Sequence, residues 1–544
     1  MKQVFARALS CALAVGILLT GCHAHRPISE SLSTKRLVVQ LGPDPETIDP
    51  ALCNTQDAGT MILHAFEPLL TIDEHNQIRG GQAEQWDVSP DGLVWTFHLR
   101  EGLQWSDGTD LTAEDFIYSW NRLADPALNA PYASTMLGMV KGFDEAAAGT
   151  PNALALSAPD PRTLVVELSA PCPYFDKLAA FSVLCPVNRA AVESHSSSWS
   201  KKSHSYISNG PFKMKEWEPG SHIILEKNPR YWNKDAVKLD ELQFTLTDSS
   251  ADSFRAFQNG ELMLTKDVPT EEIPRLLHDH ESQFRIEPMV GTYLLNFNMD
   301  RPYFQDVRVR KALSIALDRD YIAELLMQET YTAANGLIGP GVTDADGTSF
   351  FMDHANGGEP YFSSNAKANL ATARQLLEEA GYPDGSGFPT IHYLVNESGY
   401  NLAVADYLQS RWAKLGITLE IDIMDWASFT TARRAGNFDI VRSGWICDYD
   451  DPTALLDLFI SENGNNIGHY CNPQFDQAMK AAASTVDSVQ RFAYLHQAED
   501  ILMEDVGLIP LAYYNDYWLQ NSKLKDFWHT PYGYFMFMFA DLED

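Results

Sequence analysis

The sequence is poor in basic residues and in cysteines, and each scarcity excludes a class of function. Lysine and arginine together number 40, against 73 aspartates and glutamates, which gives a formal net charge of −33. A chain of this balance has no basic surface to neutralise phosphates, so nucleic acid is excluded as a partner. The seven cysteines include no Cys-x-x-Cys pair, which argues against a zinc site and against thioredoxin-like redox chemistry.

Sequence motifs for catalysis are missing as well. There is no Gly-x-Ser-x-Gly elbow, no Gly-x-x-x-x-Gly-Lys phosphate loop and no His-Glu-x-x-His zinc helix. His278, Asp279 and His280 follow a helical segment in an acidic context, which favours solvated side chains over metal ligands. We therefore predict a protein that is not an enzyme and that holds no cofactor or metal. The alternative from a different class is an exported hydrolase, which would consume its substrate.

The rest of the composition is that of an ordinary soluble globular protein. Hydrophobic residues make up 45% of the 544 residues and charged residues 21%. This length is too great for a single hydrophobic core and predicts two to four domains. No internal repeat or low-complexity segment interrupts the chain.

The N-terminus has the pattern of an export signal. Lys2 and Arg7 precede an apolar run over residues 8–19, which is too short to span a bilayer comfortably. The run ends in Leu-Thr-Gly-Cys, the order of a bacterial lipobox, so we predict a lipoprotein signal peptide over 1–21 and lipidation of Cys22. Residues 22–36 are polar and serine-rich and are predicted to form a tether. A plain signal peptide or an uncleaved anchor is the alternative.

Five cysteines remain beyond the lipidation point, and an odd number leaves at least one thiol unpaired. Cys172 and Cys185 both lie beside prolines and are the pair favoured for a local disulfide.

Residues 438–452 form the segment of most interest. It opens as a strand rich in apolar and β-branched residues and then changes character. Gly444 permits close approach of another backbone, Trp445 offers a large apolar face, and Asp448 brings a charge. The alternative is a strand that simply ends in an acidic surface turn.

The pattern of strands and helices changes near Gly291. Before that point, residues 94–100 alternate like a half-buried strand, and Thr112 caps a helix that has acids in its first turn. After it, strands and helices alternate, which predicts an α/β lobe. The elements expected there are strands over 292–298 and 418–424, helices capped by Asp306 and by Asn369, and a helix over 402–415.

Several segments together resemble the oligopeptide- and dipeptide-binding proteins of bacterial ABC importers, the extracellular solute-binding proteins of family 5. The resemblance runs from about Leu37 to Trp518. It is most specific over residues 95–120 and in the Arg-x-Gly-Trp-x-x-Asp-Tyr segment that ends at Tyr449. Further matches are Ile-Asp-Pro at 48–50, Phe-Glu-Pro-Leu at 66–69, Asn-Gly-Pro-Phe at 209–212 and Asn-Pro-Arg-Tyr-Trp at 228–232.

The resemblance implies an α/β fold of the periplasmic-binding-protein type (class II-like, cluster C). Two lobes close on a hinge, and a third domain is added. Lobe I would comprise residues 37–66, 190–290 and 512–544, lobe II, the extra domain, residues 67–189, and lobe III residues 291–511. Such a protein would be an extracytoplasmic monomer, lipid-anchored on the periplasmic side of the membrane, that delivers oligopeptides to the permease subunits of an ABC transporter.

The resemblance also assigns roles to residues. Asp448 would pair with the α-ammonium of a bound peptide, and an extended peptide would hydrogen-bond like an added strand. Arg433 and Arg442 would be available to a ligand carboxylate, with a structural ion pair as the alternative. The remaining implied ligand contacts are the backbone of Gly444 and Ile446, the loop Asn54-Thr55-Gln56, the aromatic walls Trp426, Trp445 and Tyr132, and Tyr449 beside the anchor.

One departure from the family pattern concerns rigidity. Many members have a cysteine directly after the Gly-Trp that is bridged to a cysteine before the Thr-Tyr strand. Here those positions are Ile446 and Gly291, so that disulfide is expected to be absent. Relatives within the family take dipeptides, murein peptides or other small solutes, and these stay open as alternative ligands.

Overall fold

The protein is described by a computed structural model that covers residues 34–353, 361–362, 366–397 and 399–543. The predicted signal peptide over 1–21, the lipidation site Cys22 and most of the tether lie outside the described residues. Within those ranges, no helix has both the length and the apolar character needed to cross a membrane.

Eleven strands of the described residues form one mixed sheet, whose order is β15-β14-β16-β12-β17-β11-β1-β10-β9-β8, with β13 paired to β17 beside this path. The strands are β1 (Arg36–Gly42), β8 (Phe212–Glu218), β9 (His222–Lys227), β10 (Glu241–Leu246), β11 (Leu264–Thr265), β12 (Phe284–Phe297), β13 (Tyr331–Ala333), β14 (Ile391–Asn396), β15 (Leu419–Met424), β16 (Ile440–Ile446) and β17 (Leu508–Gln520).

The predicted α/β lobe is confirmed around β14, β15 and β16. These three strands are parallel, and helices α13 (Gly399–Ala413) and α14 (Trp426–Arg434) connect them in sequence. In parallel sheets of this kind, ligands bind beyond the carboxyl ends of the strands. The carboxyl end of β16 is the Gly-Trp segment singled out above.

The helix boundaries expected in this lobe are partly correct. Asp306 caps α9 (Val307–Ile315) through its side chain, as predicted. The prediction that Asn369 caps a helix is wrong, because α12 (Ala366–Glu379) begins three residues earlier. Ala366, Lys367 and Ala368 are all good helix formers, so the helix extends back past the asparagine.

A separate four-stranded sheet lies in residues 83–167, with the order β4-β5-β7-β6. Helix α2 (Ala113–Ala124) buries Phe116 and Trp120, and Asp115 accepts a hydrogen bond from the backbone N–H of Thr112 at 2.8 Å, a capping box. The strands are β4 (Ala83–Val88), β5 (Val94–Leu99), β6 (Leu156–Asp160) and β7 (Thr163–Glu167).

The other elements are short or peripheral to the two sheets. The helices are α1 (Gln56–Ala65), α3 (Ala133–Leu137), α4 (Phe143–Ala147), α5 (Phe175–Leu178), α6 (Arg189–His195), α7 (Ser250–Gln258), α8 (Ile273–His278), α10 (Arg319–Tyr321), α11 (Phe350–Asp353), α15 (Thr453–Leu456), α16 (Pro473–Ala483) and α17 (Ser488–Glu504). The strands pair as β2 (Leu70–Ile72) with β3 (Ile78–Gly80), β18 (Leu524–Lys525) with β21 (Asp541–Leu542), and β19 (Trp528–His529) with β20 (Phe535–Met536).

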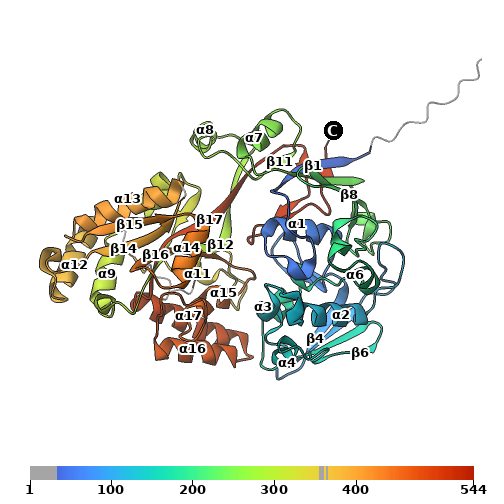
Figure 1. Cartoon of the computed structure of the whole chain (residues 1–544), viewed down its shortest axis with the longest axis horizontal. Helices are drawn as coiled ribbons and strands as arrows, with labels where there is room; N and C mark the ends of the chain where they lie inside the picture. The colour runs from blue at the N-terminus through green and yellow to red at the C-terminus, as the bar shows by residue number, and fades with distance from the viewer. Residues whose placement is uncertain (1–33, 354–360, 363–365, 398, 544) are drawn as a thin grey trace, which may run out of the picture. The chain divides into compact units, whose positions relative to one another are not determined.

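Two long antiparallel strands, β12 and β17, join the α/β part of the chain to the part that holds α1, β1 and β8 (Figure 1). Their pairing is interrupted between Pro288 and Thr292, where the register shifts. Directly before this interruption, Glu287 and Asp516 lie opposite each other, and the buried His529 contacts both carboxylates. The histidine therefore bridges two like charges that would otherwise repel each other across the ladder.

The disulfide predicted between Cys172 and Cys185 is not formed. All five cysteines of the described residues are free. The two thiols have different neighbours, since Cys172 lies near Tyr174 and Asp451 whereas Cys185 lies near Glu67 and Cys53. Both are buried in the core, and burial raises the pKa of each thiol.

Candidate functional site

Strand β16 has one edge that is only partly paired. It pairs with β12 from Ile440 to Ile446, but with β14 only at Ile440 and Val441. Beyond Val441, no strand in the described part of the chain continues on that edge. The backbone N–H and C=O groups there are free to bind a ligand in an extended conformation.

Two glycines allow this region to pack closely. A Cβ atom on Gly444 would lie 2.2 Å from the Tyr514 hydroxyl, so a larger residue would push the Tyr514 side chain away from β16. Gly291 lies directly opposite Ile446 in the ladder, where the family disulfide would lie. A Cβ atom there would be 2.9 Å from the Ile446 Cα, so contact between the backbones takes the place of the cross-link.

Asp448 follows β16 and forms no ion pair with any residue in the described ranges. The Tyr132 hydroxyl donates a hydrogen bond to its carboxylate at 3.1 Å. Burial raises the pKa of Asp448 to about 6, and the hydrogen bond from Tyr132 only partly offsets this effect. A cationic partner would strongly stabilise the charged form of a carboxylate in this environment.

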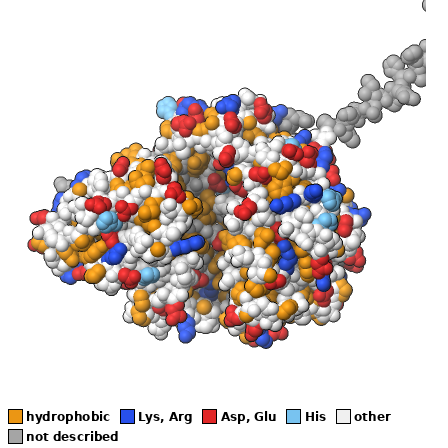
Figure 2. All heavy atoms as spheres, viewed as in Figure 1, with side chains coloured by type: hydrophobic (Ala, Val, Ile, Leu, Met, Phe, Trp, Pro, Cys, Tyr) orange, Lys and Arg blue, Asp and Glu red, His pale blue; other side chains and the backbone are white. Residues whose placement is uncertain are grey.

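A cavity of about 160 Å³, here named the anchor cavity, contains Asp448, Ile446, Tyr132 and the loop of residues 54–56. In that loop, Thr55 caps α1 and Gln56 donates to the Tyr532 carbonyl at 2.9 Å. The site residues predicted on both sides of the anchor thus come together in one cavity. Figure 2 shows a recess in the molecular surface between the parts that β12 and β17 connect.

A second cavity of about 480 Å³, here named the strand cavity, lies along β16 before the anchor. It contains Gly444, Trp445, Arg433 and Trp426, and the Trp426 side chain is 59% exposed. A large exposed aromatic side chain at the edge of a cavity is available to contact a ligand.

The two arginines predicted to meet a ligand carboxylate are half-buried. The alternative of a structural ion pair is wrong for the described residues, since neither guanidinium pairs with a carboxylate among them. Arg433 donates to Ser443 Oγ at 3.0 Å, while Arg442 donates to the Tyr514 hydroxyl at 3.3 Å and lies over the Tyr293 ring. Burial and the nearby charges of Arg442 and Arg434 lower the pKa of Arg433. Arg433 lines the strand cavity, whereas Arg442 does not and instead contacts Tyr293 and Tyr514.

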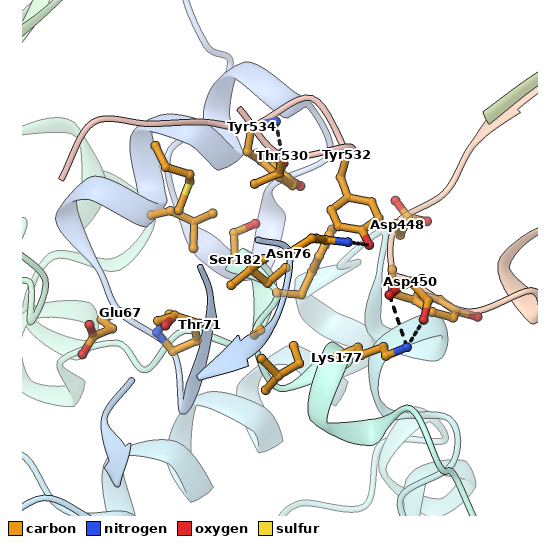
Figure 3. Close-up of a pocket in the computed structure, with 18 of the residues that line it drawn as sticks. Glu67, Thr71, Asn76, Lys177, Ser182, Asp448, Asp450, Thr530, Tyr532 and Tyr534 are labelled. Atoms are coloured by element: carbon orange, nitrogen blue, oxygen red, sulfur yellow. Dashed lines mark hydrogen bonds and ion pairs between the residues drawn. The ribbon is translucent and has the colours of Figure 1, made fainter. Parts of the chain in front are cut away.

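Tyr449 is engaged by its neighbours. Its ring stacks on Tyr174 at 5.0 Å between centroids, with the planes 4° apart. The next residue, Asp450, pairs with Lys177 at 3.6 Å (Figure 3). The segment after the anchor therefore contacts the part of the chain that holds α5.

Sequence reasoning missed the aromatic side chains that complete the site. Phe181, Tyr532 and Tyr534 line the anchor cavity together with Asp448, and all three are buried. The signal for two of them was the aromatic-rich segment near the C-terminus, residues 531–539. The described residues contain no cluster of three or more His, Cys, Asp or Glu side chains that could hold a metal ion.

Comparison with known proteins gives matches over nearly the whole chain. A sequence profile of the bacterial extracellular solute-binding proteins, family 5 Middle, matches residues 77–466. The chain is 32% identical over 520 residues to the periplasmic oligopeptide-binding protein OppA of Salmonella typhimurium, which covers 94% of this chain and 93% of that protein. It is 33% identical over 474 residues, 86% of both chains, to the probable deoxycholate-binding periplasmic protein YgiS of Escherichia coli.

Among solved structures, the fold is similar to the unliganded open form of MppA, a periplasmic murein tripeptide binding protein. The TM-score is 0.80 at 29% sequence identity, over 94% of this chain and 98% of that one. The described fold is therefore that of a two-lobed solute-binding protein with an additional domain.

Proposed function

Because the chain belongs to the bacterial extracellular solute-binding proteins of family 5, we propose that it captures oligopeptides outside the cytoplasm and delivers them to the permease subunits of an ABC transporter. It acts as a monomer, and a lipid on Cys22 holds it at the periplasmic side of the membrane. It is not an enzyme and releases its ligand unchanged.

The observation that carries this proposal is the Asp448 carboxylate. It is half-buried, has no cationic partner among the described residues, and stands where the open edge of β16 ends. A peptide that extends along this edge would place its α-ammonium at the carboxylate and its main chain against Gly444 and Ile446. Charge-assisted hydrogen bonds to the ammonium would offset the cost of desolvation.

Arg433, on α14, and Arg442, on β16, supply the opposite charge near the strand cavity. A short peptide held at Asp448 by its amine would bring its C-terminal carboxylate toward them. Main-chain hydrogen bonding is indifferent to sequence, and water in the strand cavity can adapt to different side chains. Trp426, Trp445 and Tyr132 would form the aromatic walls around the ligand.

Capture requires that the lobes close on the peptide. Lobe I is taken as residues 37–66, 190–290 and 512–544, and lobe III as residues 291–511. The chain then passes from lobe I to lobe III inside β12 and returns to lobe I inside β17. A change of backbone angles at the interrupted pairing near Pro288 would move one lobe against the other. The ligand would favour closure because it contacts both sides of the anchor cavity only in the closed state.

The relatives differ in the ligands that their names state: oligopeptides, a murein tripeptide and deoxycholate. Deoxycholate is an anion, which the unpaired Asp448 carboxylate would repel, whereas a peptide amine would be attracted. A murein peptide or a dipeptide carries such an amine and remains a candidate for the same site.

The test is calorimetric titration of the purified protein with Ala-Ala-Ala and with its N-acetylated form. We expect saturable binding of the free amine only, with the peptide recovered intact. Equal binding of the acetylated form would contradict the anchor, and steady release of fragments would favour an exported hydrolase.

A further inference from the structure

Residues 335–338, here named the hinge loop, are attached to β12 and β17 at the point where the pairing of these strands resumes. Thr292 of β12 and Tyr513 of β17 lie opposite each other there and form the first pair beyond the interruption that begins at Pro288. The Thr292 hydroxyl donates to a carbonyl of the hinge loop at 2.6 Å. The Tyr513 hydroxyl accepts hydrogen bonds from two of its backbone N–H groups, at 2.9 and 3.1 Å. The hinge loop is therefore fixed to both strands directly beside the interruption.

Glu499 of α17 provides a further attachment for the hinge loop. Its Oε1 atom accepts a hydrogen bond from the Ile338 backbone N–H at 2.8 Å. A Cβ atom on Gly336 would lie 2.9 Å from the same oxygen, so the loop packs closely on the carboxyl group. The Glu499 side chain is fully buried, and its Oε2 atom has no hydrogen-bond partner.

No cation pairs with Glu499 in the part of the chain that the structure describes. The titratable and charged side chains near the carboxyl group and the Tyr513 hydroxyl have partners of their own; they are Asp500 and His496 on α17, Tyr361, Tyr513 on β17 and Arg319 on α10. The Arg319 guanidinium donates to the Pro510 carbonyl at 2.8 Å and to the Ser314 hydroxyl at 3.0 Å. Asp500 adds a charge of the same sign as an ionised Glu499. These surroundings favour the neutral carboxyl group.

The proton on Glu499 is coupled to the position of the hinge loop. Burial raises the pKa of Glu499 to about 8, and the backbone N–H groups of the loop only partly offset this effect. If the loop opens and water reaches the carboxyl group, the pKa returns toward its ordinary value of 4.5 and the proton leaves to water. Opening therefore releases a proton between pH 4.5 and pH 8, so the closed loop loses stability as pH rises through this range.

A carboxyl group is not required merely to hold the loop. A glutamine would accept the same hydrogen bond from Ile338 and carries no proton that can be lost. The residue present here makes the attachment depend on pH. His529 adds a dependence of the same sign on the other side of the interruption, since its charge bridges Glu287 and Asp516 and is lost as pH rises.

We propose that Glu499 is a proton-dependent clasp that controls the mobility of the hinge. The protonated carboxyl group holds the hinge loop against β12 and β17, and loss of its proton to water accompanies release of the loop. This inference rests on the proposed function, in which the lobes close by a change of backbone angles at the interrupted pairing. The hinge is then stiffer in an acidic medium than in a neutral one.

Hydrogen exchange of the backbone amides of the hinge loop tests the clasp, measured from pH 5 to pH 8 and corrected for the exchange rate of an unstructured chain. In the unmodified chain, protection should fall by up to about tenfold per pH unit. In Glu499→Gln it should stay nearly constant, because the amide loses no proton. Glu504 is exposed on the same helix, so Glu504→Gln is the matched control and should show the slope of the unmodified chain.

Flat protection in the unmodified chain would overturn the clasp, and so would an equal slope in Glu499→Gln. Loss of the slope in Glu504→Gln would also overturn it, because the slope would then not depend on Glu499 alone. If Glu499→Gln does not fold, the profile of the unmodified chain decides.

Stopped-flow mixing with Ala-Ala-Ala tests whether the clasp acts on the hinge. Trp426 and Trp445 line the strand cavity, so their fluorescence should report lobe closure. A released hinge loop lets β12 and β17 change their backbone angles faster. The closure rate of the unmodified chain relative to Glu499→Gln should therefore rise by about threefold or more from pH 6 to pH 8, with His529 present in both proteins.

A constant ratio of the two closure rates would show that the clasp does not control the hinge. Absence of any response to the peptide in both proteins would instead refute the proposed function, and the exchange profile would still decide whether Glu499 holds the loop.

Discussion

Replacement of Asp448 by asparagine should make the ligand-free protein more stable and weaken its affinity for peptides. The rise in the pKa of Asp448 from 3.8 to about 6 corresponds to a cost of about 3 kcal/mol for the charged form at pH 7. This is the reverse of the usual aspartate, whose pKa is depressed and whose charge stabilises the fold. The cost is fully present above pH 6 and disappears below the unfolded pKa near 3.8.

Asparagine keeps the shape and an acceptor for the Tyr132 hydroxyl but carries no charge. We expect Asp448→Asn to raise the free energy of unfolding at pH 7 by about 1–3 kcal/mol, and to do so much less at pH 4. Peptide affinity should fall by about 2–5 kcal/mol, the usual loss when one member of a buried charge pair is removed. Urea unfolding at the two pH values and calorimetric titration measure both effects.

Asp450 provides the matched control, because it is a nearby carboxylate that is buried and pairs with Lys177 and with the Thr343 N–H. Asp450→Asn should lower stability at pH 7. A loss of stability in Asp448→Asn would mean that the carboxylate is a structural group. Unchanged peptide affinity in that variant would remove Asp448 from the site.

Four further results are expected. Peptide affinity should fall about tenfold per pH unit below pH 6, because protons compete with the ammonium for Asp448; a flat profile from pH 7 to 4.5 would count against the anchor. In competition among tri- to pentapeptides, amidation of the C-terminus should weaken binding to the unmodified chain but not to Arg433→Ala or Arg442→Ala; a ranking that none of these changes alters would make both arginines structural. Burial opposes the charge of His529, but its hydrogen bond to Asp516 and its contact with the Glu287 carboxylate at 3.7 Å raise its pKa. The stabilisation by charged His529 is therefore present below the unfolded pKa of 6.5 and is lost as pH rises through the folded pKa. The stability difference between the unmodified chain and His529→Gln should therefore shrink from pH 6 to pH 9. Growth of that difference would show that charged His529 does not bridge the two carboxylates. Saturating peptide should reduce the radius of gyration in solution scattering and raise the melting temperature, and no compaction would argue against lobe closure.

The local patterns of the sequence predicted most elements of the fold. Alternation over residues 94–100 and the Thr112 cap fixed β5 and the start of α2, because both signals depend only on neighbouring residues. The prediction that Asn369 caps a helix failed because its preference for the cap position is weaker than the helix propensity of the three preceding residues. The Cys172–Cys185 disulfide failed because closeness in sequence does not determine which way two side chains point.

The candidate site depended on contacts between distant parts of the chain. Asp448 and the loop at 54–56 were found because their local motifs resemble a family pattern. Tyr132 approaches Asp448 from 316 positions away, and only the fold gives the distance between them. Tyr532 and Tyr534 carry no motif, and their role follows from the path of the C-terminal segment past α1. The open edge of β16 likewise appears only when its register with β14 is known.

The most direct measurement of the central claim is titration of one tripeptide, as free amine and as N-acetyl form, into the unmodified chain and into Asp448→Asn, with mass spectrometry of the recovered peptide. Capture of the peptide amine by Asp448 without turnover predicts that the free amine binds well only to the unmodified chain, that the acetylated peptide binds neither protein well, and that the peptide is recovered whole. Equal binding of both peptide forms, or recovery of cleaved fragments, would contradict it.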